Sequence, residues 1–189
     1  MDFVRHGLSR DLVNDVRSNP ETPLVEEGRV QAGHAGQIIA VRKEPPDLIL
    51  SSPLPRAFET AEIIARVIGY DIDTIKIEPG LAERNWGNYT GKQNSWIEEQ
   101  IGSEAEAFDS VPGAETIEQL QERAAGVFDR ILALPQAYIL VVGHAQFGRA
   151  LRRHIAGLPA SFEYTHDTGS FENGEVVRFY PAPSSLTRG

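Results

Sequence analysis

Short apolar runs alternate along this chain with longer stretches in which apolar residues recur at helical spacing. The most regular strand candidate is Tyr138–Val142, a continuous apolar run with a β-branched majority. The clearest helix candidate covers residues 115–134, where apolar residues recur three or four positions apart. Strands that alternate with helices predict an α/β fold, in which helices cover both faces of a largely parallel sheet.

The same patterns give approximate bounds for the other elements. The expected strands are 2–4, 47–50, 74–77, 138–142 and 175–179, and the expected helices are 24–42, 52–69, 115–134 and 146–157. Pro45 and Pro135 follow two of these helices, and Gly69 ends a third. A chain of 189 residues is of a size for one domain, which we place at 1–180, with 181–189 as a loose C-terminal tail.

Composition narrows the range of functions. The chain has no cysteine, which excludes disulfides, thiolate nucleophiles and cysteine-based metal sites. Its net charge of −9 argues against a nucleic-acid partner, because clustered Lys and Arg supply that affinity. No run approaches the ~20 apolar residues of a membrane span, and the first residues lack a signal peptide's apolar core. We therefore expect a cytoplasmic protein without a membrane partner, and any anionic substrate needs a local basic pocket.

Three of the expected strands run into basic or imidazole side chains. Arg5 and His6 follow the first strand, and His144 follows the strand at 138–142. Arg56 lies one turn into the helix after the strand at 47–50. The carboxyl ends of parallel strands meet at one edge of a sheet, close to helix N-termini that attract anions. If these strands are parallel, the sequence predicts an anion site with two histidines and two arginines.

This set of side chains suits phosphoryl transfer. Two guanidinium groups can donate paired hydrogen bonds to a phosphate dianion. A neutral histidine can attack phosphorus, and a second histidine, if protonated, can stabilise the charge on the phosphoryl oxygens. A general acid is then needed to protonate the leaving oxygen. Neither a Gly-x-Ser-x-Gly elbow nor a nucleotide-binding phosphate loop is present as an alternative.

The segment Val4–Gly7 resembles the opening motif of the histidine phosphatase superfamily, also called phosphoglycerate-mutase-like. The resemblance continues in order through Pro23–Gly28 with Gln31-Ala32, Ser51–Ala57 with Thr60-Ala61, Leu81–Gly87 with Gly91, Pro112–Thr116, and Val142–His144 with Arg149. Arg-His-Gly alone is a weak signal, but segments in this order across about residues 3–151 are specific.

The resemblance implies a three-layer α/β/α sandwich with a largely parallel central sheet. It implies that His6 is the phosphorylated nucleophile and that Arg5, Arg56 and His144 complete the phosphate pocket. It also implies that Glu83 is the proton donor. The family's chemistry uses no metal, so we expect no metal and no other cofactor.

Some positions depart from the family pattern and concern further substrate contacts. Ser9 stands in for the usual Thr or Ser, and Leu12 replaces an Asn commonly found six residues after the nucleophile. Asn14 lies nearby but off register. Ala145 replaces a Gly after the second histidine and keeps its backbone N–H available. Ser9, Asn14 and Ala145 are therefore candidate substrate contacts beside Arg5 and Arg56. The loop residue Arg84 is either a further substrate contact or a solvated loop charge.

Other residues keep two interpretations. Glu78 lies close to Glu83 in sequence and is the second candidate for the acid. Four aromatic residues form either an apolar lid over the leaving group or the packing of a long loop: Trp86, Tyr89, Trp96 and Phe108. We interpret His34 and His154 as structural, while His166 precedes a turn near the expected rim of the site.

These features together predict a phosphomonoesterase that acts on a phosphorylated small molecule through a phosphohistidine and releases inorganic phosphate. The alternatives are a phosphoglycerate mutase and a non-catalytic module that binds a phosphorylated ligand. A mutase needs extra cations for a second anionic group, whereas the segment Lys92–Val111 has one Lys against five acidic residues: Glu98, Glu99, Glu104, Glu106 and Asp109. The oligomeric state stays open, with a homodimer among the options.

Overall fold

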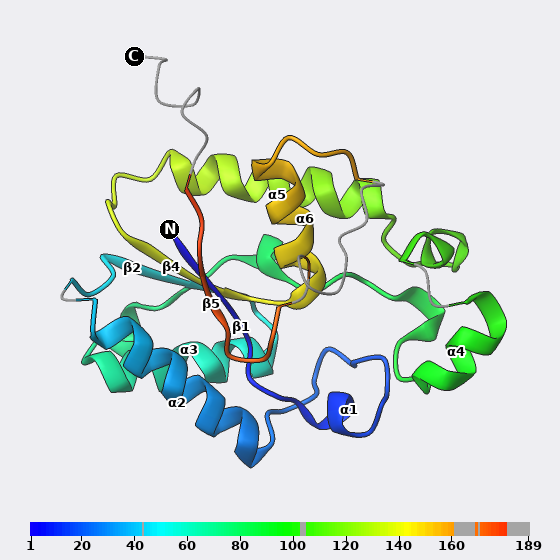
Figure 1. The fold of residues 1–189 in the computed structure, drawn as a ribbon, viewed down its shortest axis with the longest axis horizontal. Helices are drawn as coiled ribbons and strands as arrows, with labels where there is room; N and C mark the ends of the chain where they lie inside the picture. Colours follow the sequence, from blue (N-terminus) through cyan, green and yellow to red (C-terminus); the bar gives the residue numbers. More distant parts are fainter. Residues whose placement is uncertain (43, 103–104, 161–168, 170, 181–189) are drawn as a thin grey trace.

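A five-stranded sheet forms the centre of the computed structural model, which describes residues 1–42, 44–102, 105–160, 169 and 171–180. The strands are β1 (Asp2–Arg5), β2 (Leu48–Ser51), β3 (Lys76–Ile77), β4 (Ile139–Gly143) and β5 (Val176–Arg178). Their order across the sheet is β3-β2-β4-β1-β5. The first four strands run parallel, and β5 pairs antiparallel with β1 (Figure 1).

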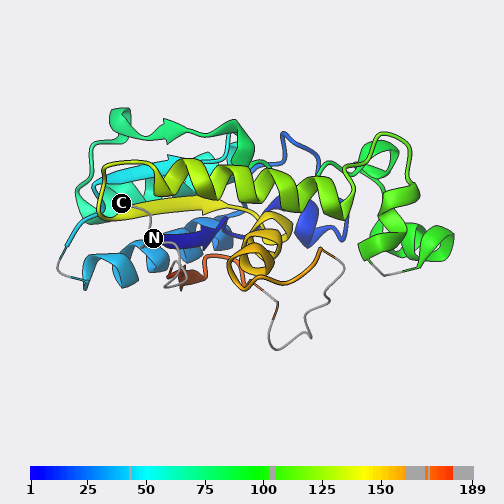
Figure 2. The same ribbon diagram turned by 90° about the horizontal axis from the view of Figure 1, so that it is seen from above.

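Helices cover both faces of this sheet. The α-helices are α1 (Arg10–Val13), α2 (Glu26–Ala40), α3 (Pro55–Ile68), α4 (Asn94–Ile101), α5 (Ile117–Leu132) and α6 (Ala145–Ile155), and short 3-10 turns are η1 (Ile72–Thr74), η2 (Pro79–Leu81), η3 (Gly87–Tyr89) and η4 (Ala105–Ser110). Helices α2 and α3 pack on one face, and α5 and α6 pack on the other (Figures 1 and 2). The prediction of a three-layer α/β/α sandwich is confirmed.

The alternation of side chains along the strands explains why the apolar runs are continuous. In β1, Phe3 contributes to the core beneath α5 and α6, while Val4 contributes to the core beneath α2 and α3. In β4, Val141 belongs to the core beneath α5 and α6, and Leu140 belongs to the core beneath α2 and α3. Both side chains are fully buried. A strand with helices on both faces has no polar side to present to water.

Local capping chemistry sets the helix ends close to where the sequence places them. Helix α3 begins at Pro55 and ends before Gly69, which adopts the left-handed conformation with φ 71°. Helix α5 begins with a capping box, in which Thr116 and Gln119 exchange side-chain-to-backbone hydrogen bonds. None of the helices in the described part of the chain is long and apolar enough to cross a membrane.

One expected strand is shorter than predicted, two short helices were not predicted, and one expectation falls outside the described residues. The strand expected at 74–77 is only Lys76–Ile77, because the Asp71 side chain caps a 3-10 turn over Ile72–Thr74. Helices α1 and α4 were not predicted. The C-terminal tail at 181–189 lies outside the part of the chain that the structure describes.

A close backbone approach fixes the segment after β1 against the start of α2. A Cβ atom on Gly7 would lie 2.1 Å from the carbonyl oxygen of Gly28, so neither position has room for a side chain. The backbone N–H of Val25 donates to the Leu8 carbonyl at 3.0 Å, and the Leu8 N–H donates to the Gln31 side chain at 2.8 Å. This contact explains why glycine is needed at position 28 and why Gln31 is part of the motif. It fixes the segment that follows His6 against the start of α2.

Candidate active site

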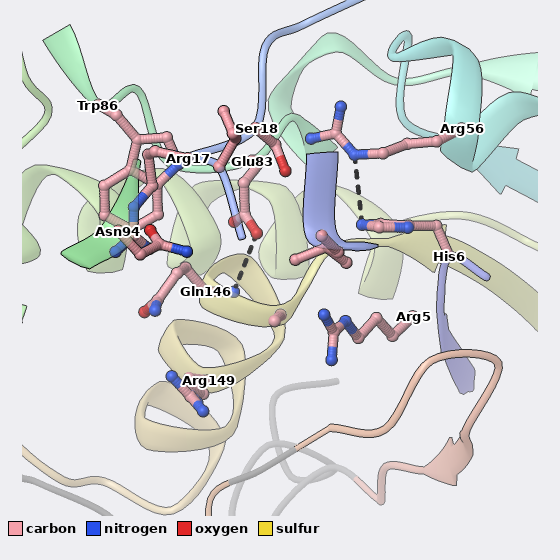
Figure 3. A pocket seen from close by; sticks show the side chains of 13 residues that line it. Arg5, His6, Arg17, Ser18, Arg56, Glu83, Trp86, Asn94, Gln146 and Arg149 are labelled. Atoms are coloured by element: carbon pink, nitrogen blue, oxygen red, sulfur yellow. Dashed lines mark hydrogen bonds between the residues drawn. The ribbon is translucent and has the colours of Figure 1, made fainter. Parts of the chain in front are cut away.

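A pocket of about 200 Å³ lies where the carboxyl ends of β1, β2 and β4 meet. Its lining residues come from the end of β1, from α1 and the segment after it, from the loop at Glu83 and from the first turns of α3, α4 and α6 (Figure 3): Arg5, His6, Leu12, Val16, Arg17, Ser18, Arg56, Glu83, Trp86, Asn94, Ala145, Gln146 and Arg149. The parallel strands thus bring together the arginines and His6 that the sequence indicated, and His144 lies buried beside them.

The His6 imidazole is buried and held in one tautomer by its two hydrogen bonds. Its Nδ1 lies 2.7 Å from the Gly7 carbonyl oxygen, which can only accept, so Nδ1 carries the proton. Its Nε2 accepts from the Nε of Arg56 at 3.2 Å. Burial, with the charges of Arg56 and Arg5, lowers the pKa of His6 well below its usual value. His6 is therefore neutral at neutral pH, and its lone pair is on Nε2, where it accepts the hydrogen bond from Arg56.

His144 lies directly beside His6. The two ring centroids are 5.0 Å apart in an edge-to-face arrangement. Its Nε2 lies 2.8 Å from the Ser52 hydroxyl, while its Nδ1 is buried without a hydrogen-bond partner. Burial and the charge of Arg56 lower the pKa of His144 well below its usual value. A phosphate dianion beside it would counter the arginine charges and favour the protonated ring.

Arg5 and Arg56 approach the same region from the end of β1 and the first turn of α3. Arg56 is 1% exposed, and its Nη1 donates to the carbonyls of Asn19 and Pro20 at 3.1 and 3.2 Å. Arg5 donates from Nη1 to the Phe171 carbonyl, and its Nε has no partner. Burial lowers the pKa of both arginines, and the negative charge of Glu83 opposes that effect.

The structure adds two arginines that the sequence did not place in the pocket. Arg17 stacks over Trp86, with its guanidinium carbon 4.4 Å from the ring centroid. Arg149 donates from Nε to the Gly169 carbonyl at 3.0 Å. The sequence could have indicated Arg149 as a pocket residue, because it follows His144 within the second histidine motif. Arg17 belongs to no motif and lies in an irregular loop. Among the described lining residues, four arginines therefore surround a single carboxylate, Glu83.

The Glu83 carboxylate lies at the N-terminus of α6. Its Oε1 accepts from the backbone N–H of Arg84 at 2.9 Å and of Phe147 at 3.3 Å, and its Oε2 accepts from Gln146 at 3.4 Å. Figure 3 shows it between the side of the pocket that holds His6 and the side that holds Arg17. Glu78 does not line this pocket, because its carboxylate accepts from the Gly80 N–H and pairs with Arg130. The geometry favours Glu83 as the candidate acid.

Arg123 on α5 holds the loop that carries Glu83. Its Nη1 donates to the carbonyls of Gly80 and Ala82 at 2.7 and 2.8 Å. Its Nε and Nη2 bind both carboxylate oxygens of Glu115 at 2.7 and 2.6 Å. Such a two-point pair has a defined geometry, so the loop is tied to the helix layer.

The other candidate contacts fall in different places. Ala145 lines the pocket. Arg84 is buried beside it, donates to Asp109 and to the Glu115 carbonyl at 2.6 and 2.8 Å, and lines a neighbouring pocket of about 180 Å³. Ser9 is fully buried at the N-cap of α1, and Asn14 is exposed at the C-cap of that helix. Neither Ser9 nor Asn14 lines the pocket, and His166 lies outside the described residues.

Packing accounts for most of the aromatic residues near the site. Trp86 and Phe108 pack edge-to-face at 4.9 Å and form a small core with Ile97 and Val111. Trp96 is 41% exposed and contacts Tyr89. Of the four aromatic residues that we considered as a lid, only Trp86 lines the pocket.

The chain matches a family of known proteins in sequence. A sequence model described as the histidine phosphatase superfamily (branch 1) matches residues 1–182. A 2,3-bisphosphoglycerate-dependent phosphoglycerate mutase from Parvibaculum lavamentivorans is 31% identical over 161 residues, which span 79% of this chain and 76% of that protein.

Two solved structures share the fold. A mycobacterial glucosyl-3-phosphoglycerate phosphatase aligns with a TM-score of 0.78 at 22% identity, over 93% of this chain and 88% of that one. An α-ribazole phosphatase from Shigella flexneri aligns with a TM-score of 0.72 at 23% identity, over 84% and 80% of the two chains.

Proposed function

Because this chain belongs to the histidine phosphatase superfamily, we propose that it hydrolyses phosphomonoesters of small molecules through a phosphohistidine on His6. The observation that carries the proposal is the state of the His6 ring: Nδ1 is bound to a carbonyl and Nε2 presents its lone pair beside Arg56. A neutral imidazole with an unprotonated Nε2 next to buried cations can attack phosphorus once the Arg56 N–H that Nε2 accepts is released to the phosphoryl group.

In the first step, the phosphoryl group of the ester binds among Arg5, Arg56 and His144. Nε2 of His6 attacks phosphorus, and the bond from phosphorus to the leaving oxygen breaks as the bond to nitrogen forms. Glu83 gives its proton to the leaving oxygen, so that an alcohol departs. The fixed guanidinium groups stabilise the charge on the phosphoryl oxygens without having to reorganise.

In the second step, water attacks the phosphohistidine. Glu83, now a carboxylate, takes a proton from that water while the water oxygen forms its bond to phosphorus. The bond from phosphorus to Nε2 breaks, inorganic phosphate leaves, and the neutral ring is restored. The partners implied by this cycle are a phosphorylated small molecule and inorganic phosphate. The cycle uses no cofactor. Among the described residues, no three His, Asp or Glu side chains gather as a metal site would require.

The direct test is phosphate release from p-nitrophenyl phosphate and glycerol 3-phosphate. We expect His6→Ala to lower the rate at least about 10³-fold. The matched control is His34→Ala, since His34 is exposed on α2 and should have no effect. Hydrolysis by His6→Ala at the wild-type rate would reject His6 as nucleophile. Tight binding of inorganic phosphate without turnover of any ester would indicate a binding module instead.

A second candidate, phosphoglycerate mutase, is favoured by the 31% identical relative that carries this name. The pocket also corrects our charge argument against it, because Arg17 and Arg149 supply cations that the acidic segment 92–111 lacks. We retain hydrolysis because the described part of this segment packs mainly into an aromatic core with Trp86, and of its described residues only Asn94 lines the pocket that holds His6. Incubation with 3-phosphoglycerate separates the two: a phosphatase releases phosphate, and a mutase forms 2-phosphoglycerate.

A further inference from the structure

Arg123 on α5 binds the backbone just before Glu83. One guanidinium nitrogen, Nη1, donates to the carbonyls of both Gly80 and Ala82, at 2.7 and 2.8 Å. Gly80 lies in η2, and Ala82 directly precedes Glu83 in the chain. Because each of these carbonyls takes its partner from the same side chain, the position of Arg123 sets where this stretch of backbone lies.

Glu115, two residues before α5 begins, binds the backbone just after Glu83. Its N–H donates to the Asn85 carbonyl at 2.9 Å, and its own carbonyl accepts from Nε of Arg84 at 2.8 Å. One of its carboxylate oxygens also accepts from the Asn85 N–H at 3.4 Å. Glu83 therefore lies between two stretches of backbone that are anchored separately.

An ion pair joins the two anchors to each other. Nε and Nη2 of Arg123 bind the two carboxylate oxygens of Glu115 at 2.7 and 2.6 Å. The side chains are 25% and 15% exposed, so water screens this pair less than a surface pair. We propose that Arg123 and Glu115 are positioning residues, which place the Glu83 carboxylate for proton transfer. This inference rests on the proposed phosphatase function.

The contacts of the Glu83 carboxylate itself explain why such support is needed. It accepts from the N–H of Arg84 at 2.9 Å, but its two hydrogen bonds from α6, donated by Phe147 and Gln146, are 3.3 and 3.4 Å long. Bonds of this length hold a carboxylate weakly. A displacement of about 1 Å costs a catalytic group about 10²-fold in rate, because a proton moves only over hydrogen-bond distance. Arg123 does not line the pocket that holds His6, so its effect on the reaction must pass through Glu83.

The same helix offers a matched control residue. Arg130, about two turns after Arg123 on α5, pairs with Glu78 at 2.9 Å, at the start of the same loop. Its side chain is 58% exposed, and its other hydrogen bond within the described part of the chain is to the Gly126 carbonyl of its own helix. Replacing Arg130 removes the same charge from α5 and an ion pair to the loop, but it leaves both anchors beside Glu83 in place.

The experiment compares glycerol 3-phosphate, whose alkoxide needs a proton, with p-nitrophenyl phosphate, whose phenolate leaves without one. We measure kcat/KM for both esters, since this constant reports the first chemical step. Arg123→Gln should lower it about 10- to 100-fold for glycerol 3-phosphate and less than about 3-fold for p-nitrophenyl phosphate. Arg130→Gln should keep the wild-type ratio of the two constants.

Two further variants separate positioning from a loss of folding. Glu115→Gln keeps the shape of the side chain but breaks the two-point pair, so it should shift the ratio in the same direction as Arg123→Gln. Arg123→Lys should shift the ratio less, because an ammonium group keeps the charge but cannot bind both carboxylate oxygens in parallel. Equal losses for the two esters in these folded variants would overturn the inference. An equal shift of the ratio in Arg130→Gln would overturn it as well.

Amide hydrogen exchange keeps this test separate from the proposed function. The N–H groups of Gln146 and Phe147 lie in the first turn of α6, where no carbonyl of the helix is available to them, and they donate to Glu83. Displacement of Glu83 in Arg123→Gln should speed their exchange about 10-fold, whereas Arg130→Gln should not change it.

If the wild type turns over neither ester, the phosphatase proposal fails by itself, and the exchange rates decide the positioning role. Faster exchange at these two N–H groups in Arg123→Gln but not in Arg130→Gln supports the role. Unchanged exchange in Arg123→Gln overturns it.

Discussion

The two ends of strand β1 hold buried charge in opposite ways. At its start, Asp2 is fully buried and accepts hydrogen bonds from Arg178 at 2.7 and 3.1 Å, from Tyr138 at 2.6 Å and from Arg42. At its end, Arg5 begins a pocket in which four arginines share one carboxylate. In the first cluster the buried carboxylate is hydrogen-bonded to three side chains, whereas in the second a buried donor, Nε of Arg5, has no partner.

The pKa directions follow the same division. Burial, the largest influence on Asp2, raises its pKa, but the hydrogen bonds from Arg178 and Tyr138 and the charge of Arg42 outweigh it, so that the pKa is lowered. In the pocket, burial lowers the pKa of Arg5 and of His6 without a compensating set of carboxylates. We interpret the cluster at Asp2 as structural, and the pocket, where buried charged groups lack partners, as a ligand site. The predictions below test this contrast, from the largest expected effect to the smallest.

Arg56→Ala should give the largest effect on activity at the pocket end. We expect kcat to fall about 10²- to 10³-fold, because Arg56 contacts His6 and stabilises charge that develops in the transition state. The free energy of unfolding should change by no more than about 1 kcal/mol, because the loss of two backbone hydrogen bonds is offset by the removal of a desolvated cation. Steady-state kinetics and urea denaturation measure the two quantities. A rise in KM at constant kcat would make Arg56 a ground-state contact only.

Glu83→Gln should slow hydrolysis by an amount that depends on the leaving group of the substrate. Hydrolysis of an alkyl phosphate should fall about 10²-fold or more, because an alkoxide needs a proton as it departs. Hydrolysis of p-nitrophenyl phosphate should fall much less, because that phenolate leaves without one. The ratio of kcat values for the two substrates is the measurement. Equal losses would move the acid role to another residue.

Asp2→Asn, at the other end of β1, should reduce stability and leave activity unchanged. We expect it to lower the free energy of unfolding by about 1–2 kcal/mol. The loss is no larger because Arg42 and Arg178 are partly exposed and water screens their charges. The kcat and KM for p-nitrophenyl phosphate should stay at their wild-type values wherever the variant is folded. A selective loss of activity in the folded variant would show that the two ends are coupled.

The two clusters should also lose stability in different pH ranges. His6 and His144 have lowered pKa values, so the unfolded chain binds more protons than the folded one once pH falls below about 6.5. Stability should then decrease on acidification by at most about 1.4 kcal/mol per pH unit for each histidine. Asp2, whose pKa is lowered, keeps its contribution until pH falls below its ordinary value near 3.8.

Urea denaturation at several pH values checks this prediction. Between pH 6.5 and 5, a His6→Ala/His144→Ala double variant should lose less stability than the wild type, and His34→Ala should behave as the wild type. A double variant with the wild-type pH profile would contradict the proposed origin of the acid sensitivity.

The four residues at the strand ends could be predicted from the sequence because parallel strands bring their carboxyl ends together. Arg5, His6, Arg56 and His144 each follow or nearly follow an apolar run, and the structure places them at one edge of the sheet. Glu83 was different: it lies between short 3-10 turns with no periodicity, and only the family resemblance indicated it.

The missed features depend on contacts between distant segments. Arg17 reaches the pocket because its backbone pairs with the chain at Gly91 and Lys92, which no local pattern encodes. Helix α4 has eight residues, of which Ile97 is the one buried apolar side chain, so it has no amphipathic repeat to detect. Both belong to the side of the pocket that would bind the leaving group.

Trapping of the phosphoenzyme tests the central claim most directly. Wild-type protein mixed briefly with labelled substrate and quenched in alkali should carry one phosphoryl group, stable to base and labile to acid, on the peptide that contains His6. His6→Ala should carry none. A phosphoryl group on another residue, or hydrolysis in a single turnover without any phosphoenzyme, would contradict the account.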